Sequence, residues 1–152
     1  MRIAIPMLLL GFLFAIPAFA QEVEPFERSS LAIESAKGRH AFSVEVARSV
    51  RQQAQGLMYR RDMAADHGML FDYNPPRRVA MWMKNTFIPL DMLFIGADGR
   101  IVSIAQRTLP QSLDLIDFAG PVRGVLELNA GTVARLGIAT GDRVVHPIFA
   151  GN

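Results

Sequence analysis

Short runs of alternating hydrophobic and polar residues, separated by turn-forming residues, cover most of the chain. Phe42, Val44 and Val46 alternate with polar residues, which is the period-two pattern of a strand with one buried face. A short turn containing Gly38 joins this run to the apolar run 31–35, and glycine suits a turn that needs a positive φ. The pattern therefore predicts a β-hairpin near the start of the folded domain.

Six further segments are predicted to be strands. Segments 79–86 and 88–96 carry apolar residues on both pleat faces, which indicates central strands buried on both sides. The others are the short apolar run 69–71 and the segments 101–105, 122–128 and 143–148. Asn74-Pro75-Pro76 is predicted to break the chain, and residues 110–121 are predicted to form a long loop.

Two short helices are predicted between these strands. Ser49 suits an N-cap, Gln52 three residues later completes a capping box, and the apolar residues of segment 50–56 fall on one helical face. Segment 132–136 suits one or two helical turns ended by Gly137. Seven or eight short strands with two short helices indicate a mainly β fold of α+β type, a compact and mostly antiparallel β sandwich or barrel.

The first twenty residues have the pattern of a secretory signal peptide. Arg2 gives a positive start, Met7–Ile16 is apolar, and the chain then reaches an Ala-x-Ala cleavage pattern before the polar Gln21. Ten apolar residues span only about half of a hydrocarbon core of roughly 30 Å, which disfavours a membrane anchor. The predicted organisation is a signal peptide over 1–20, a flexible N-terminal arm over 21–30 and a single β-rich domain over 31–152.

Composition and charge exclude several classes of function. Arg2 is the one charge in the predicted signal, so 15 of the 16 basic residues remain against 14 acidic ones, and this near-neutral balance gives no indication of nucleic-acid binding. The chain has no cysteine, which excludes disulfides and thiolate chemistry.

The cleaved protein is expected in the periplasm or outside the cell, without a transmembrane segment. Its oligomeric state is not indicated by the sequence.

Basic residues are concentrated in one part of the chain. Between residues 48 and 84, seven basic residues face three acidic ones. This bias indicates either a basic surface or a set of scattered, solvated arginines.

Four stretches together resemble a known family. They are Gly56–Arg60, Gly68–Phe71, the tryptophan-centred stretch Met81–Asp91, and Val125–Leu128 with Arg135–Ile138. The combination is similar to the widespread prokaryotic family named domain of unknown function 192, over about residues 42–145. The resemblance implies a small β-rich domain, often exported, with no established reaction.

The tryptophan-centred stretch and two isolated carboxylates form the candidate site. On an extended segment Trp82 and Lys84 project to the same side. Asp91 and Glu127 each stand alone between apolar neighbours, so each carboxylate should be at least partly desolvated and Asp91 should have a partner that is a cation or a hydrogen-bond donor. The candidate partners of Asp91 are Lys84, Arg60 and Arg78.

Two interpretations of these residues remain open. In the structural one, Asp91 pairs with a basic residue and Glu127 caps a backbone donor. In the functional one, the residues line a pocket for a small polar or anionic ligand, where tryptophan stacks, the amide hydrogen-bonds and the basic side chains bind anionic groups. The candidate ligand-binding residues are Arg60, Trp82, Lys84, Asn85, Asp91 and Glu127.

Two alternative functions are weaker. A hydrolase that uses Asp91 and Glu127 as acid and base needs the carboxylates about 5 to 9 Å apart and one raised pKa. Copper binding is suggested by the six methionines that follow the signal, all between residues 58 and 92, because thioethers suit Cu(I); methionine also fills irregular cores. No histidine flanks Asp91 or Glu127 in the sequence, and none lies near Met81 and Met83. We therefore expect no metal and no cofactor, and favour a binding module.

Overall fold

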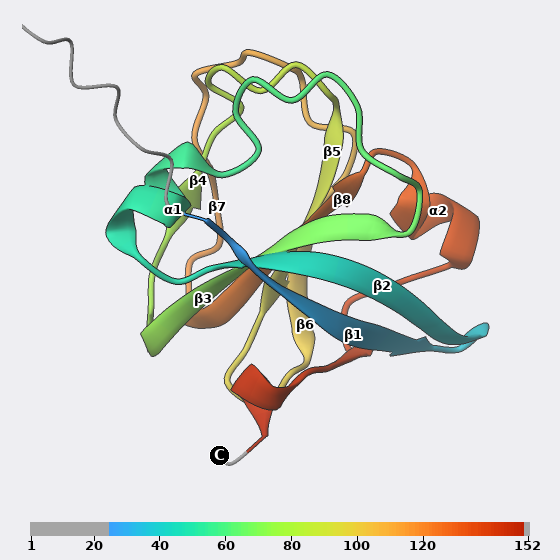
Figure 1. Cartoon of the computed structure of the whole chain (residues 1–152). Coiled ribbons are helices and arrows are strands. Elements are labelled where there is room, and N and C mark those ends of the chain that lie inside the picture. The colour runs from blue at the N-terminus through green and yellow to red at the C-terminus, as the bar shows by residue number, and fades with distance from the viewer. Residues whose placement is uncertain (1–24, 151–152) are drawn as a thin grey trace, which may run out of the picture.

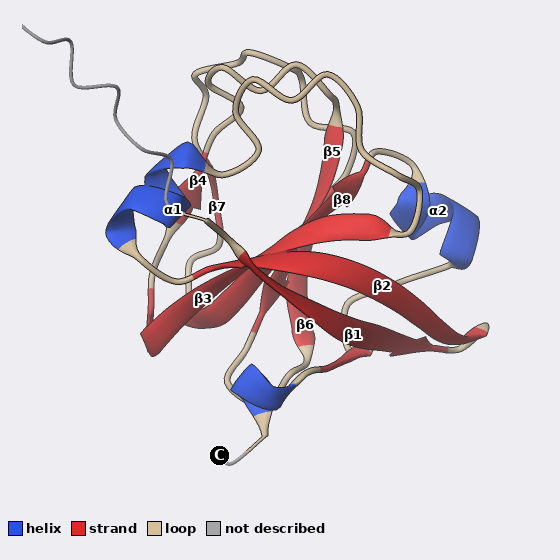
Figure 2. Cartoon of the chain, in the orientation of Figure 1, coloured by secondary structure: helices blue, strands red, loops and turns tan. Residues whose placement is uncertain are grey.

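The computed structural model describes residues 25–150, and the predicted signal peptide lies outside the described residues. The strands of the main sheet are β1 (Glu27–Ser35), β2 (Gly38–Ala47), β3 (His67–Arg77), β5 (Leu90–Ile95), β6 (Ile101–Ala105), β8 (Val122–Asn129) and β9 (Arg143–Val145). This seven-stranded sheet has the order β6-β5-β8-β3-β2-β1-β9 (Figures 1 and 2). Its neighbours are antiparallel except for the parallel pair β2–β3. A second, two-stranded sheet pairs β4 (Ala80–Met81) with β7 (Ile116–Asp117).

The main sheet curls until its two edge strands approach each other. Arg100 and Arg143 form an isolated antiparallel bridge, and the Ile101 N–H donates to the Asp142 carbonyl at 2.9 Å. The curled sheet forms a half-barrel. The prediction of a mainly β fold with two short helices is confirmed.

Both predicted helices are present. In α1 (Val50–Gln55) the Ser49 hydroxyl accepts the Gln52 N–H at 3.1 Å, and the Gln52 side chain accepts the Ser49 N–H at 3.1 Å. This reciprocal pair is the predicted capping box. Helix α2 (Thr132–Leu136) ends at Gly137, which has a φ of 64°. A single 3₁₀ turn, η1 (Pro147–Phe149), follows β9.

The segment 79–86 differs from its prediction. It was predicted as a central strand, but only Ala80 and Met81 are paired, in β4. Burial nevertheless alternates along it, because Met81 and Met83 are buried whereas Trp82 and Lys84 are exposed. A segment that covers a core from outside shows the same alternation as a strand, although it lacks hydrogen-bonded neighbours on both sides.

Other boundaries also differ from their predictions. The predicted loop 110–121 contains β7, and the predicted strand 143–148 ends at Val145. The chain does not break at Asn74-Pro75-Pro76, because β3 continues to Arg77 through a register shift in its pairing with β8. Strand β1 begins at Glu27, so four residues of the segment predicted as a flexible arm, 27–30, pair with β2.

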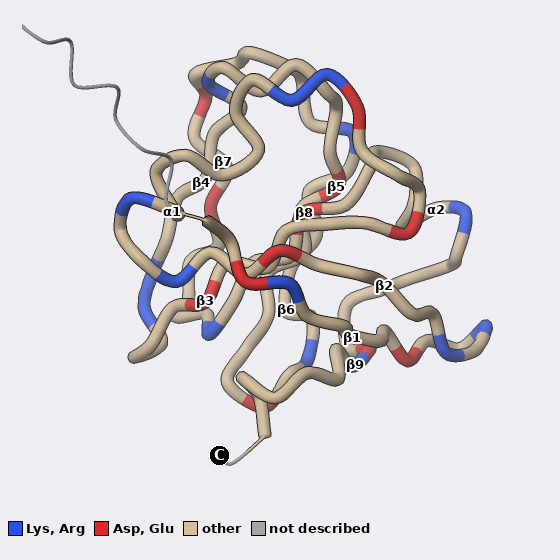
Figure 3. Tube along the Cα trace, viewed as in Figure 1, with Lys and Arg blue, Asp and Glu red and all other residues tan. Residues whose placement is uncertain are grey.

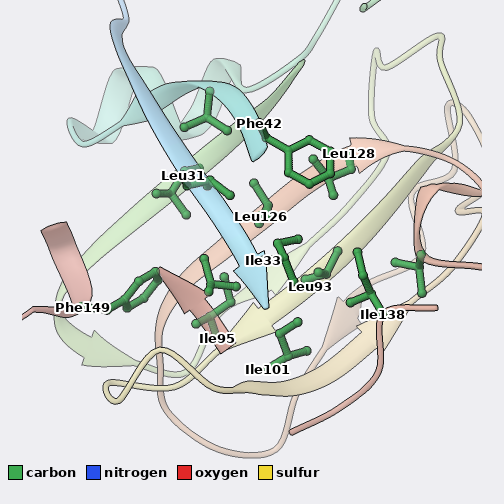
Figure 4. Close-up of a cluster of buried hydrophobic side chains, with 14 of the residues drawn as sticks. Leu31, Ile33, Phe42, Leu93, Ile95, Ile101, Leu126, Leu128, Ile138 and Phe149 are labelled. Atoms are coloured by element: carbon green, nitrogen blue, oxygen red, sulfur yellow. The ribbon is translucent and has the colours of Figure 1, made fainter. Parts of the chain in front are cut away.

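The main sheet separates two hydrophobic cores. The inner core lies within the curl and includes the residues labelled in Figure 4: Leu31, Ile33, Phe42, Leu93, Ile95, Ile101, Leu126, Leu128, Ile138 and Phe149. The outer core lies on the opposite face and includes Met69, Phe71, Tyr73, Met81, Met83, Met92, Phe94 and Val125. Over residues 125–128 of β8 the side chains alternate between the cores, so Glu127 lies on the same face as Val125 and points toward the outer core. Within residues 25–150, no helix is long and apolar enough to cross a membrane.

Candidate functional site

A pocket of about 250 Å³ opens on the outer-core side of the sheet. Helix α1 and the residues after it form one wall, the end of β3 forms another, and the segment after β4 forms a third. The lining residues with polar groups include Gln53, Tyr73, Arg77, Lys84 and Glu127. Trp82 also lines it and is 43% exposed, whereas Glu127 is 4% exposed. The indole therefore lies at the mouth and the carboxylate at the inner end.

Glu127 is a buried acid without a partner among the described residues. Its cross-strand neighbours are Met69 on β3 and Met92 on β5, and both are fully buried. No hydrogen bond or ion pair reaches its carboxylate from any residue in the range 25–150. Burial raises the pKa of Glu127 to about 8. The side chain is therefore mostly protonated and uncharged at pH 7.

The packing of β3 against β8 fixes the position of Glu127. A Cβ atom built on Gly68 of β3 would lie 2.6 Å from the Glu127 carbonyl oxygen. Glycine at this position allows the two backbones to come together at the inner end of the pocket.

Tyr73 lies beside the buried acid. Burial raises the pKa of the Tyr73 hydroxyl, and the nearby Glu127 carboxylate raises it further. The hydroxyl donates to the Met81 Sδ at 3.4 Å, so its oxygen lone pairs are left to accept. The Tyr73 ring stacks with Phe71 at 6.4 Å between centroids. Aromatic rings, a thioether and a carboxyl group thus surround the inner end.

Two cations lie at the mouth of the pocket. The Lys84 Nζ is 5.0 Å from the centre of the Trp82 ring, which confirms that the two side chains project to the same side. The Arg77 guanidinium carbon is 5.0 Å from the centre of the Tyr73 ring, and its Nη2 donates to the Gln53 side chain at 3.1 Å. In the described part of the chain neither cation forms a salt bridge. Figure 3 shows further basic positions around α1 and the end of β3.

Asp91 occupies a different environment. It is fully buried, and its carboxylate accepts the backbone N–H groups of Arg107 and Val133, each at 2.9 Å. The predicted need for a donor is therefore met by two backbone amides and not by Lys84, Arg60 or Arg78. This carboxylate ties the start of α2 and the chain after β6 to β5.

The two isolated carboxylates point to opposite faces of the sheet. Asp91 lies across from Leu128, and Glu127 lies across from Met92. Because opposing residues share a face, Asp91 points to the inner core and Glu127 to the outer core. A hydrolase that uses these two groups on either side of one bond does not fit this geometry.

Arg60 and Asn85 also lie outside the lining of this pocket. Arg60 pairs with Glu45 and lines a separate cavity of about 210 Å³. Asn85 has a φ of 54°, and its Nδ2 donates to the Tyr59 hydroxyl at 2.9 Å. Of the six candidate ligand-binding residues, Trp82, Lys84 and Glu127 line this pocket, whereas Arg60, Asn85 and Asp91 do not.

Comparison with known proteins gives the family. Residues 32–146 match the model of DUF192, described as Uncharacterized ACR. The chain belongs to the DUF192 family. A solved structure from Sinorhizobium meliloti 1021, called a "putative transcription regulator", is 52% identical to this chain with a TM-score of 0.77, and the match covers 79% of this chain and 94% of that one. A protein of unknown function from Novosphingobium aromaticivorans DSM 12444 is 41% identical with a TM-score of 0.79 and covers 82% and 89%. No curated protein matches the sequence.

Sequence reasoning missed five polar residues that line this pocket, namely Gln53, Gln55, Tyr73, Arg77 and Thr86. Both Tyr73 and Arg77 lie on β3 beyond the predicted apolar run 69–71, and Arg77 also lies beyond the predicted break at Asn74-Pro75-Pro76. The alternation Met69, Phe71, Tyr73 would have placed the tyrosine on the outer face if the strand had been extended. Gln53 carries no such signal, because its role depends on where α1 packs.

The methionines of the DUF192 domain pack mainly in the outer core. The Met83 Sδ accepts the Thr108 hydroxyl at 3.1 Å, and the Met81 Sδ accepts the Tyr73 hydroxyl. Within the described residues no group of three or more His, Cys, Asp and Glu side chains could hold a metal. Core packing accounts for the clustering of methionine seen in the sequence.

Proposed function

We propose that this chain is an exported binding module that holds a small polar ligand with an anionic group in the pocket between α1, β3 and the segment after β4. The observation that carries the proposal is the pair of cations at the mouth, Lys84 and Arg77, which have no carboxylate partner among the described residues. Glu127 does not neutralise them at pH 7, because it is mostly protonated. The N-terminal signal pattern supports export to the periplasm or beyond.

The mouth has the chemistry expected of an oxyanion site. An anion about 4 Å from one cation gains about 4 kcal/mol of Coulomb energy at an effective dielectric of 20, before desolvation is subtracted. Charge-assisted hydrogen bonds from an ammonium or a guanidinium are stronger than those between neutral groups. The exposed part of Trp82 adds an apolar surface against which the rest of the ligand packs.

The single tryptophan gives a direct test. Trp82 is the only tryptophan in the chain, so its fluorescence reports on the pocket. We expect acetate and inorganic phosphate to change its emission, with affinities that weaken as salt is added. Lys84→Met should weaken this binding about tenfold, which corresponds to about 1.4 kcal/mol.

The matched control is Lys37→Met. Lys37 is the other lysine of the chain and is exposed in the turn between β1 and β2, at the tip of the hairpin away from α1 (Figure 1). The Lys37→Met variant should bind acetate and inorganic phosphate as tightly as the parent protein does. Equal effects of the two substitutions, or affinities that do not change with salt, would count against the proposal.

A further inference from the structure

The inner end of the pocket offers hydrogen-bond acceptors and electron-rich surfaces. The Glu127 carboxyl group, the rings of Phe71 and Tyr73 and the Met81 thioether all lie there. The two hydroxyl groups in the lining are already committed as donors: Tyr73 donates to Met81, and Thr86 donates to the Lys84 carbonyl at 3.2 Å. This end is therefore suited to a group that carries protons and positive charge, since cations are attracted to aromatic faces and to carboxylates.

The outer end has the opposite character, because Lys84 and Arg77 lie there with the amide of Gln53. A plain cation would have to pass these two charges to reach the inner end. A plain anion would bind at the mouth and make no favourable contact with Glu127 at the inner end. A ligand with a negative outer end and a positive inner end satisfies both ends at once.

We propose that the ligand is a zwitterion of the amino-acid class, whose ammonium group meets Glu127 and whose carboxylate meets Lys84 and Arg77; this inference rests on the proposed function. The cavity of about 250 Å³ has room for such a molecule. At about 30 Å³ per water molecule in the liquid, it corresponds to about eight waters, and hence to a ligand of about eight non-hydrogen atoms.

Binding of the ammonium should release a proton. The ligand's positive charge favours the ionised form of Glu127, so the carboxyl proton passes to the buffer and a carboxylate–ammonium pair forms. Because the free side chain is mostly protonated at pH 7, binding of a zwitterion should release up to one proton per ligand. A simple anion favours the protonated form of Glu127, so its binding should release no proton.

The experiment compares ligands that differ in which charged ends they carry and in the separation of those ends. Titrations followed by Trp82 fluorescence and by calorimetry use leucine, 4-aminobutyrate and 6-aminohexanoate, which span different separations of ammonium and carboxylate, with butyrate and butylamine as single-charge references. At least one zwitterion should bind about tenfold or more tightly than both references. Its binding enthalpy should vary with the ionisation enthalpy of the buffer, as proton release requires. Glu127→Gln should remove this advantage, so that the zwitterion binds the variant no more tightly than butyrate binds the same variant.

The outcomes separate this inference from the proposed function. If butyrate binds as tightly as the best zwitterion and Glu127→Gln changes neither affinity, the ligand is a simple anion. The inference of a zwitterionic ligand is then wrong, whereas the proposed anion-binding module stands. If butyrate, acetate and all the zwitterions fail to bind, both proposals fall. The buffer dependence is measured on the unmodified protein, so it tests the inference even if the variant folds poorly.

Discussion

Replacement of Glu127 by glutamine should stabilise the protein by an amount that grows with pH. Burial raises the pKa of this carboxyl from its ordinary 4.5 to about 8 in the folded state, and unfolding returns it to the ordinary value. Between these pH values the unfolded chain loses the proton while the folded protein keeps it. Stability therefore falls as the pH rises, by up to about 1.4 kcal/mol per pH unit.

Over the whole interval the loss amounts to about 5 kcal/mol, a large share of the roughly 5 to 15 kcal/mol that stabilises a typical domain. Water that enters the pocket lowers the cost of ionisation, so the realised loss should lie between about 2 and 5 kcal/mol. Glutamine does not titrate, so the variant escapes this loss. The two proteins should show their smallest difference near pH 5 and their largest above pH 8.

Urea denaturation at pH 5, 6, 7, 8 and 9, followed by Trp82 fluorescence, measures this difference. Both proteins share every other titrating group, so subtracting one curve from the other isolates Glu127. Glu34→Gln is the control, because Glu34 is exposed on β1 in a surface pair with Arg39 and should contribute only about 0 to 1 kcal/mol. A difference that stays constant from pH 5 to pH 9, or a glutamine variant less stable than the parent at pH 9, would refute the assignment of Glu127 as a buried, uncharged acid.

Two buried groups, Asp91 and His146, and the half-buried Asp72 give further predictions. Asp91→Asn should lower the free energy of unfolding by about 2 to 4 kcal/mol in urea denaturation, because an amide NH₂ then faces a backbone N–H; an unchanged stability would contradict its structural role. Asp72→Asn should cost about 3 kcal/mol in the same assay because the buried Arg123 loses its carboxylate, and adding Arg123→Met should recover part of that loss if the pairing is the cause. Burial lowers the pKa of His146, so below pH 6.5 the unfolded chain takes up a proton on this imidazole more readily than the folded protein does, and stability falls. His146→Gln should therefore reduce the drop in Tm between pH 7 and pH 5. An equal drop in the variant and the parent would exclude His146 as its cause.

Local patterns predicted the elements that depend on neighbouring residues. The hairpin of β1 and β2 follows from period-two alternation and a glycine turn, and α1 follows from its capping box. The shared side of Trp82 and Lys84 follows from extended backbone alone, and the ring contact confirms it. Each of these features is decided within a few residues of sequence, so the sequence contains the information needed.

The surroundings of the site residues depend on long-range contacts, which the spacing of residues along the sequence does not specify. Asp91 and Glu127 look alike in the sequence, since each is a single acid between apolar residues. The Asp91 carboxylate accepts two backbone N–H groups, whereas Glu127 accepts none within the described chain. They differ because the pairing of β5 with β8 directs the two side chains to opposite faces of the sheet. The partners of Asp91 come from positions 16 and 42 residues further along the chain. No local pattern specifies such distant donors.

The alternation of β8 between two cores also determines where the chain tolerates insertions. Removal of one residue within β8 would turn Glu127 toward the inner core and bring Leu128 into the pocket, so the strand should not accept length changes. The connection over 57–66 packs Leu57 and Met63 on the outer core without strand pairing and should accept added residues. Efforts to alter ligand preference should therefore redesign the residues at the mouth of the pocket and leave the strands at their present length.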